Sequence, residues 1–146
     1  MSLTAGGPLQ DRADVELRIP ADGAYVSVLR TTTAGLAARL DFTIDDIEDL
    51  RIAVGEASAM VLPEADPASD LLCRFWLLPG QMTVSVSVEA AAPAAPDQDS
   101  FAWQVLTTLA STASVQAEGG RFGVTMTMKA LDLGDDDLEA ALGAGL

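Results

Sequence analysis

The segment from Thr43 to Pro63 constrains the fold most, because it marks both ends and the buried face of one long helix. Thr43 is a favourable N-cap, and Asp46, three residues later, gives an acidic variant of the capping box. Pro63 cannot continue a helix, so the helix is expected to run to about Leu62. Apolar residues recur along it at spacings of three and four: Ile47, Leu50, Val54, Ala57 and Val61. This stripe predicts a helix that buries one face in the core.

Alternation of apolar and polar residues predicts strands that are grouped in neighbouring pairs. A first strand covers residues 15–20, and segments 71–78 and 82–88 form the clearest hairpin, joined by Pro79-Gly80. A last hairpin joins residues 114–117 to 122–128. Its linking segment contains Gly119 and Gly120, and no helix follows them, so the glycines are interpreted as a turn and not as a phosphate-binding loop.

Two more helices complete the predicted order of elements. One covers about residues 24–40, and the other begins after Asp99 or Ser100 and carries Phe101 and Leu106 on its apolar side. The order is strand, helix, helix, strand, strand, helix, strand, strand. Paired antiparallel strands of this kind are typical of an α+β protein. We therefore predict a two-layer sandwich, with helices packed on one face of a mainly antiparallel mixed sheet.

The charge balance restricts the classes of partner. The chain has a formal net charge of −14 and only eight basic residues, which are scattered singly along it. Without a basic patch, direct binding to nucleic acid is not expected. The acidic surface has two open explanations, solubility alone or selection of a basic protein partner by complementary charge.

Missing residue types exclude several chemistries. The chain has no histidine, and Cys73 is its only cysteine, so catalytic pairs that need histidine and zinc sites built from these side chains are excluded. No metal site is predicted. No membrane span is predicted either, because no apolar run reaches the roughly 18 residues that a span needs. We expect a cytoplasmic protein with one domain over residues 13–131, a flexible N-terminal tail (1–12) and an acidic C-terminal tail (132–146).

Three consecutive segments carry a family resemblance. They are Leu29-Arg30-Thr31-Thr32-Thr33-Ala34, then Leu40-Asp41-Phe42-Thr43-Ile44-Asp45, then the helix from Glu48 to Val61. Their order, spacing and helix boundaries resemble anti-sigma factors of the RsbW/SpoIIAB type, which belong to the histidine-kinase-like (GHKL, Bergerat-fold) ATPases. The similarity extends from about Val15 to Lys129 and is most specific between Leu29 and Val61.

The resemblance implies a histidine-kinase-like ATPase fold with a reduced ATP lid and a regulatory function in bacterial transcription under stress. Such a protein binds and sequesters an alternative sigma factor and is controlled by partner switching with an anti-anti-sigma (STAS-type) protein. Homodimers are implied as well. By position, Arg30 matches the first-helix arginine on the surface that grips the sigma factor. A solvated arginine or an intrachain ion pair is the alternative interpretation of Arg30.

The resemblance also implies a site for Mg-ATP, and three parts of that site are changed in this chain. Glu56 matches the glutamate that serves as candidate general base, whereas Met60 stands at the position of the metal-binding asparagine. A thioether is a poor ligand for Mg²⁺, so Met60 is interpreted as a packing residue. The adenine-reading aspartate has only Glu89 as a weak substitute, and Phe101 and Trp103 stand where glycines approach the phosphates.

The sequence leaves three possible functions open. The first is an anti-sigma factor that works by binding, without efficient ATP hydrolysis or phosphotransfer. The second is an active ATP-dependent serine kinase that phosphorylates an anti-anti-sigma protein, with Glu56 as base. The third is a binding module that shares only the fold, since a fold alone does not determine function.

Overall fold

The computed structural model describes residues 12–130 of the 146-residue chain. Apart from Arg12, the predicted tails 1–12 and 132–146 lie outside the described residues, as does Leu131 at the end of the predicted domain. Within the described part, no helix is long and apolar enough to cross a membrane.

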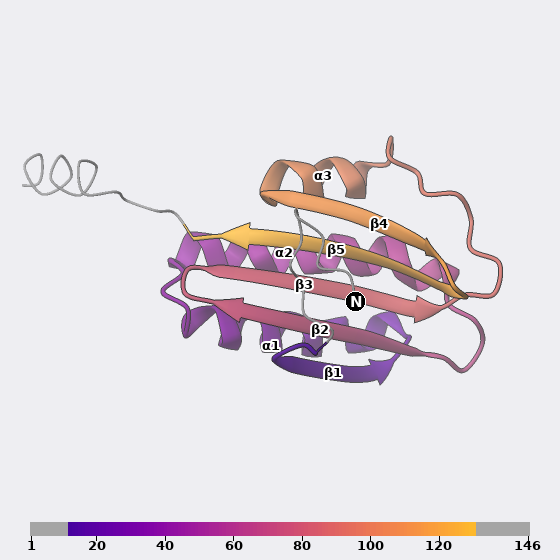
Figure 1. The fold of residues 1–146 in the computed structure, drawn as a ribbon, viewed down its shortest axis with the longest axis horizontal. Coiled ribbons are helices and arrows are strands. Elements are labelled where there is room, and N and C mark those ends of the chain that lie inside the picture. The colour runs from indigo at the N-terminus through magenta and orange to yellow at the C-terminus, as the bar shows by residue number, and fades with distance from the viewer. Residues whose placement is uncertain (1–11, 131–146) are drawn as a thin grey trace, which may run out of the picture.

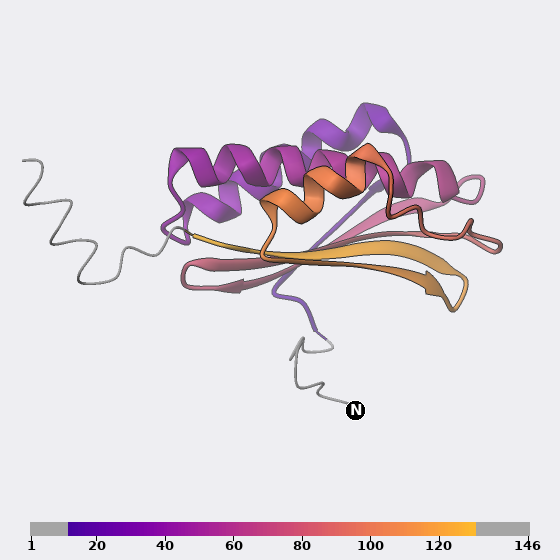
Figure 2. The same cartoon turned by 90° about the horizontal axis from the view of Figure 1, so that it is seen from above.

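Five strands and three helices form two layers in the described part of the chain (Figures 1 and 2). All three helices lie on one face of the sheet, as Figure 2 shows from the side. In chain order the elements are β1 (Val15–Pro20), α1 (Val26–Ala38), α2 (Ile44–Val61), β2 (Asp70–Leu78), β3 (Gln81–Glu89), α3 (Phe101–Leu109), β4 (Thr112–Glu118) and β5 (Arg121–Lys129).

The strand order is β1-β2-β3-β5-β4, and every described pair of neighbouring strands is antiparallel. The predicted α+β sandwich is confirmed, and the described sheet is antiparallel throughout, where a partly mixed one was expected. The β4–β5 turn holds Gly119 and Gly120 at φ of +64° and +74°, which confirms a hairpin turn there.

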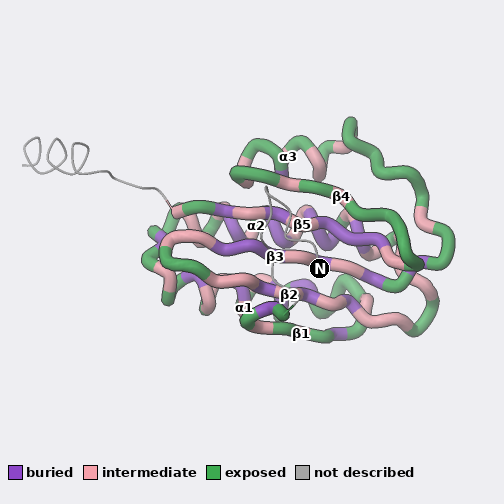
Figure 3. The backbone as a smooth tube through the Cα atoms, in the orientation of Figure 1, coloured by how far each residue is buried: buried purple, intermediate pink, exposed green. Residues whose placement is uncertain are grey.

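Helix α2 has the predicted cap and the predicted buried face. The Thr43 hydroxyl accepts a hydrogen bond from the Asp46 backbone N–H (3.1 Å), and the Asp46 carboxylate accepts one from the Thr43 N–H (3.3 Å). Leu50, Val54 and Val61 are fully buried against the sheet. Figure 3 shows the buried positions gathered on α2 and the central strands, with β4 and α3 largely more exposed.

The first helix begins later than the sequence predicts. Asp22 accepts a hydrogen bond from the Ala24 N–H (2.9 Å) and starts a short 3-10 turn over Gly23–Tyr25, after which α1 begins at Val26. The side-chain cap of Asp22 competes with regular helix at this point, which explains the difference.

Candidate functional site

One face of α2 carries the residues that the sequence predicts for a nucleotide site. Ile52, Glu56 and Met60 follow one another at intervals of four residues, so they form one row along the helix. Glu56 is half-buried, and Met60 is half-buried and packs against the hydrophobic core. The structure therefore brings Glu56 and Met60 together on this face, with apolar Ile52 one turn before them.

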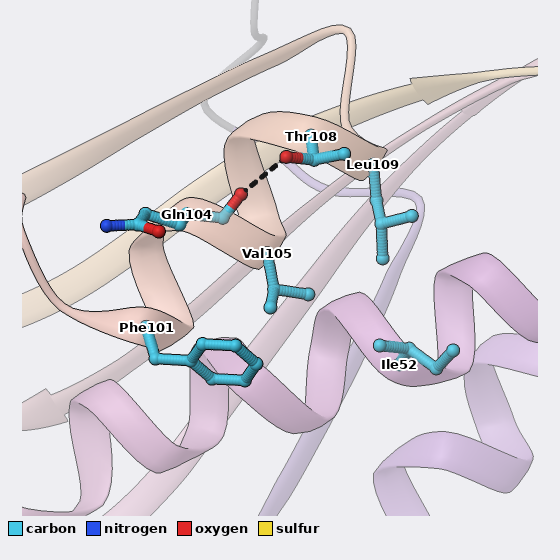
Figure 4. A pocket seen from close by; sticks show the side chains of 6 residues that line it. All are labelled: Ile52, Phe101, Gln104, Val105, Thr108 and Leu109. Carbon is cyan, nitrogen blue, oxygen red and sulfur yellow. Dashed lines mark hydrogen bonds between the residues drawn. The ribbon is translucent and has the colours of Figure 1, made fainter.

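Helix α3 packs beside this part of α2 and leaves an open groove between the two helices (Figure 4). The groove has a volume of about 380 Å³, which is at the low end of the range for small-molecule sites. Leu109 and Ile52 face each other across it, and Phe101 lies toward its other end. Its lining is mostly apolar and consists of Ile52, Phe101, Gln104, Val105, Thr108 and Leu109.

The N-terminus of α3 is closed by its own chain. The Ser100 hydroxyl accepts a hydrogen bond from the Trp103 N–H (3.1 Å), and the Ser100 carbonyl accepts one from the Gln104 N–H (3.1 Å). Phe101, the first residue of the helix, is 75% exposed. The cap takes up the Trp103 N–H, and the first turn carries aromatic side chains where a phosphate site has glycines, so this helix start is poorly suited to a phosphate.

The loop after β3, where the family has its adenine-binding segment, is held by two carboxylates. The Ala91 N–H donates to both carboxylate oxygens of Asp66 (3.0 and 3.2 Å), and the Ala94 N–H donates to Glu64 (2.8 Å). The Asp66 N–H also donates to the Glu89 carbonyl (2.8 Å). These bonds fasten the loop to the connection between α2 and β2.

Glu89 does not join the row on α2. It is the exposed last residue of β3, directly opposite Arg121 of β5. Neighbouring residues of a strand point to opposite faces of the sheet, and Val88 is fully buried with the core. Glu89 therefore belongs to the sheet face that the helices leave uncovered, away from Glu56 and Met60.

Arg30 extends from α1 across α2 at Gly55. A β-carbon built on Gly55 would lie 2.7 Å from Arg30 Nη2 and 3.0 Å from Nε, so the guanidinium occupies the space above this glycine. Within residues 12–130, Arg30 makes no hydrogen bond or ion pair to another side chain or to the backbone. The half-buried guanidinium thus rests against α2 at Gly55, and its donors are not used by the part of the chain that the structure describes.

Sequence reasoning did not find Gly55, Glu64 or Asp66 as parts of this region. An isolated glycine inside a helix was the available signal for a close approach by another group. No local signal marked Glu64 and Asp66, because their partners are the backbone of residues 91 and 94, far along the chain.

The residues present do not fit Mg-ATP in the manner of the family motif. Met60 supplies a thioether in place of an oxygen ligand, and the groove beside α3 is apolar. Among the described residues, no group of three or more His, Cys, Asp or Glu side chains could hold a metal ion.

Comparison with characterised proteins finds relatives that match about half of the chain. The chain is 35% identical over 85 residues to the serine-protein kinase RsbW of Bacillus subtilis, a match that covers 56% of this chain and 53% of the relative. The chain is similar to RsbW over about half of its length. It is also 37% identical over 76 residues to the serine-protein kinase RsbW of Bacillus velezensis, which covers 50% of this chain and 48% of that relative. The chain thus spans about half the length of the curated relatives it matches.

The fold of the chain has a counterpart among solved structures. The crystal structure of the RsbU and RsbW domains of a Mycobacterium tuberculosis protein superposes with a TM-score of 0.64 at 15% sequence identity. The superposition covers 80% of this chain and 31% of the other. This likeness shows a shared fold. No model of a protein family matches the chain.

Proposed function

We propose that this chain is an anti-sigma regulatory protein that binds and sequesters an alternative sigma factor in the bacterial cytoplasm. It is released by partner switching with an anti-anti-sigma (STAS-type) protein and acts as a homodimer, with its folded domain over residues 13–131. Its similarity to the RsbW proteins of two Bacillus species supports this class of partner. In this proposal the protein works by binding and does not depend on efficient ATP hydrolysis or phosphotransfer.

The observation that carries the proposal is the mostly apolar lining of the groove between α2 and α3. Met60 packs against the core at the position where the family has its metal-binding asparagine, and Ile52 lines an apolar groove one turn before Glu56. A phosphoryl transfer needs charge stabilisation by a metal ion and donors around the phosphates. An apolar groove supplies neither, so this face supports binding over catalysis.

Arg30 is the residue that we assign to partner binding. Its guanidinium is positioned over Gly55 and has no competing ion pair in the described part of the chain. A pre-positioned guanidinium binds a carboxylate at two points and loses little entropy on binding. Arg30→Ala is expected to weaken binding of the sigma factor while the free energy of unfolding changes by about 0.5 kcal/mol or less. Arg39→Ala, an exposed arginine just beyond α1, is the matched control.

A second candidate is an active serine kinase, because the two Bacillus relatives are named serine-protein kinases and Glu56 is retained. Titration with Mg-ATP and an assay for phosphorylation of the anti-anti-sigma protein separate the two candidates. Heat of binding together with phosphate transfer that Glu56→Gln abolishes would establish the kinase.

The partner is tested by using the protein as bait in a lysate of its source organism, with and without Mg-ATP. Mass spectrometry should identify a sigma factor at equal yield in both conditions. Recovery that depends on Mg-ATP would favour the kinase, and recovery of neither a sigma factor nor an anti-anti-sigma protein would reject the proposal.

A further inference from the structure

The groove between α2 and α3 combines an exposed apolar lining with acidic surroundings. Phe101 is 75% exposed and Ile52 is 49% exposed, although both are large apolar side chains. The two lie in the same groove, together with Val105 and Leu109 (Figure 4). Gathered apolar exposure in an otherwise well-packed domain is typical of a docking surface.

Carboxylates surround this lining on the α2 side. Glu48 and Glu56 lie four residues before and after Ile52, and Asp49 lies three residues before it, so all three share its side of the helix. Arg51 is the one basic residue of α2, and it pairs with Glu48 at 3.9 Å. The groove wall formed by α2 therefore carries a net negative charge.

The α3 side adds no positive charge to balance these carboxylates. Helix α3 contains no charged residue, and the segment before it carries Asp97 and Asp99. An anionic ligand such as a nucleotide or a fatty acid would meet like charge on entering. A second copy of the chain, with its own net charge of −14, would also bring acidic wall against acidic wall.

We propose that the groove between α2 and α3 binds an amphipathic helix of a protein partner, with an apolar face that covers Ile52 and Phe101 and basic residues along its flanks. The apolar face supplies the affinity, and the flanking lysines or arginines select the orientation through the carboxylates of α2. This surface is separate from Arg30, so the inference goes beyond the proposed function and does not depend on the identity of its partner.

The direct test is a titration of the full chain with a synthetic 18-residue leucine–lysine peptide whose sequence places all leucines on one helical face. A scrambled peptide of the same composition is the control for plain charge attraction. Ile52→Ser and Phe101→Ser should each weaken binding of the amphipathic peptide by about tenfold, as expected for central apolar contacts. Ile44→Ser is the matched control, because Ile44 lies on the same helix, is 80% exposed and does not line the groove.

The acidic wall is tested separately. Asp49→Asn combined with Glu56→Gln should weaken binding of the amphipathic peptide. The affinity of this variant should also depend less on salt concentration. The control, Asp41→Asn combined with Glu118→Gln, removes the same amount of charge at exposed positions elsewhere. All variants change surface or half-buried positions, and unchanged unfolding midpoints will confirm that each one folds.

Three results would overturn the proposal. The first is equal binding of the scrambled peptide, which would mean that charge alone attracts it. The second is binding that Ile52→Ser and Phe101→Ser leave unchanged. The third is sedimentation equilibrium in which these two variants, and not Ile44→Ser, dissociate a dimer, because a second copy would then fill the groove.

Discussion

Gly55→Ala separates the role of Arg30 in binding from its role in stability. Alanine is favoured over glycine inside a helix by about 0.5–1 kcal/mol. The added β-carbon would lie 2.7 Å from Arg30 Nη2, and an ordinary contact begins at 3.4 Å, so the guanidinium must move by about 0.7 Å or more. The guanidinium is the far end of a flexible side chain, and its displacement costs little.

We therefore expect Gly55→Ala to leave the free energy of unfolding unchanged or to raise it by up to about 1 kcal/mol. The same substitution should lower the affinity for the proposed sigma-factor partner. Urea unfolding measures the first quantity and isothermal titration calorimetry the second. Gly35→Ala on α1 is the matched control, because nothing lies within 4 Å of a β-carbon at that position. Gly35→Ala should raise the free energy of unfolding through the same helix preference of alanine over glycine. It should leave the affinity for the sigma factor unchanged.

A double-mutant cycle with Arg30→Ala completes the test. Without the guanidinium, Gly55→Ala should have no further effect on affinity, because its effect is exerted through the position of Arg30. An equal loss of affinity in the Arg30→Ala background would refute this reasoning. So would a loss of stability well beyond 1 kcal/mol for Gly55→Ala alone, since the contact would then be rigid.

Three further predictions concern the core and the pocket. Leu50→Ala, at a position with 0% exposure, should lower the free energy of unfolding by about 2–5 kcal/mol in urea titrations, whereas Ile44→Ala should change it by about 0.5 kcal/mol or less. Burial raises the pKa of the Cys73 thiol from 9.0 to about 12. The thiol's contribution to stability is therefore complete below pH 9 and is lost as the pH rises toward 12, because the unfolded thiol ionises first. The stability difference between wild type and Cys73→Ala should shrink over this range, and a constant difference would contradict the assignment. Met60→Asn should restore no calorimetric signal with Mg-ATP, because the loop fastened by Asp66 and the capped α3 remain; clear binding would mean that Met60 alone blocks the site.

The main features of the fold follow from local sequence signals. The capping box at Thr43, the apolar stripe of α2 and the alternation in β3 each depend on neighbouring residues, and each was predicted with nearly correct ends. The fully antiparallel strand order could not be derived in this way, because the pairing of β3 with β5 joins segments about 40 residues apart. Local alternation predicts a strand and its two faces, but it does not determine which other strand pairs with it.

The candidate site was predictable only in part, for the same reason. Helical spacing placed Glu56 and Met60 on one face, and the structure has them there. Alternation along β3 already places Glu89 on the face opposite Val88, and the helices cover the Val88 face. The contact of Arg30 with Gly55 depends on how α1 crosses α2, which spacing along one element does not contain.

Under the proposed function, the chain binds a sigma factor without using a nucleotide. Calorimetric titration of the sigma factor into the full chain, with and without saturating Mg-ATP, tests it most directly. The dissociation constant should be the same in both titrations, and Mg-ATP alone should give no heat. A dissociation constant that shifts about tenfold or more with Mg-ATP would correspond to a coupling of about 1.4 kcal/mol or more between the two sites, and nucleotide-independent binding would then be wrong.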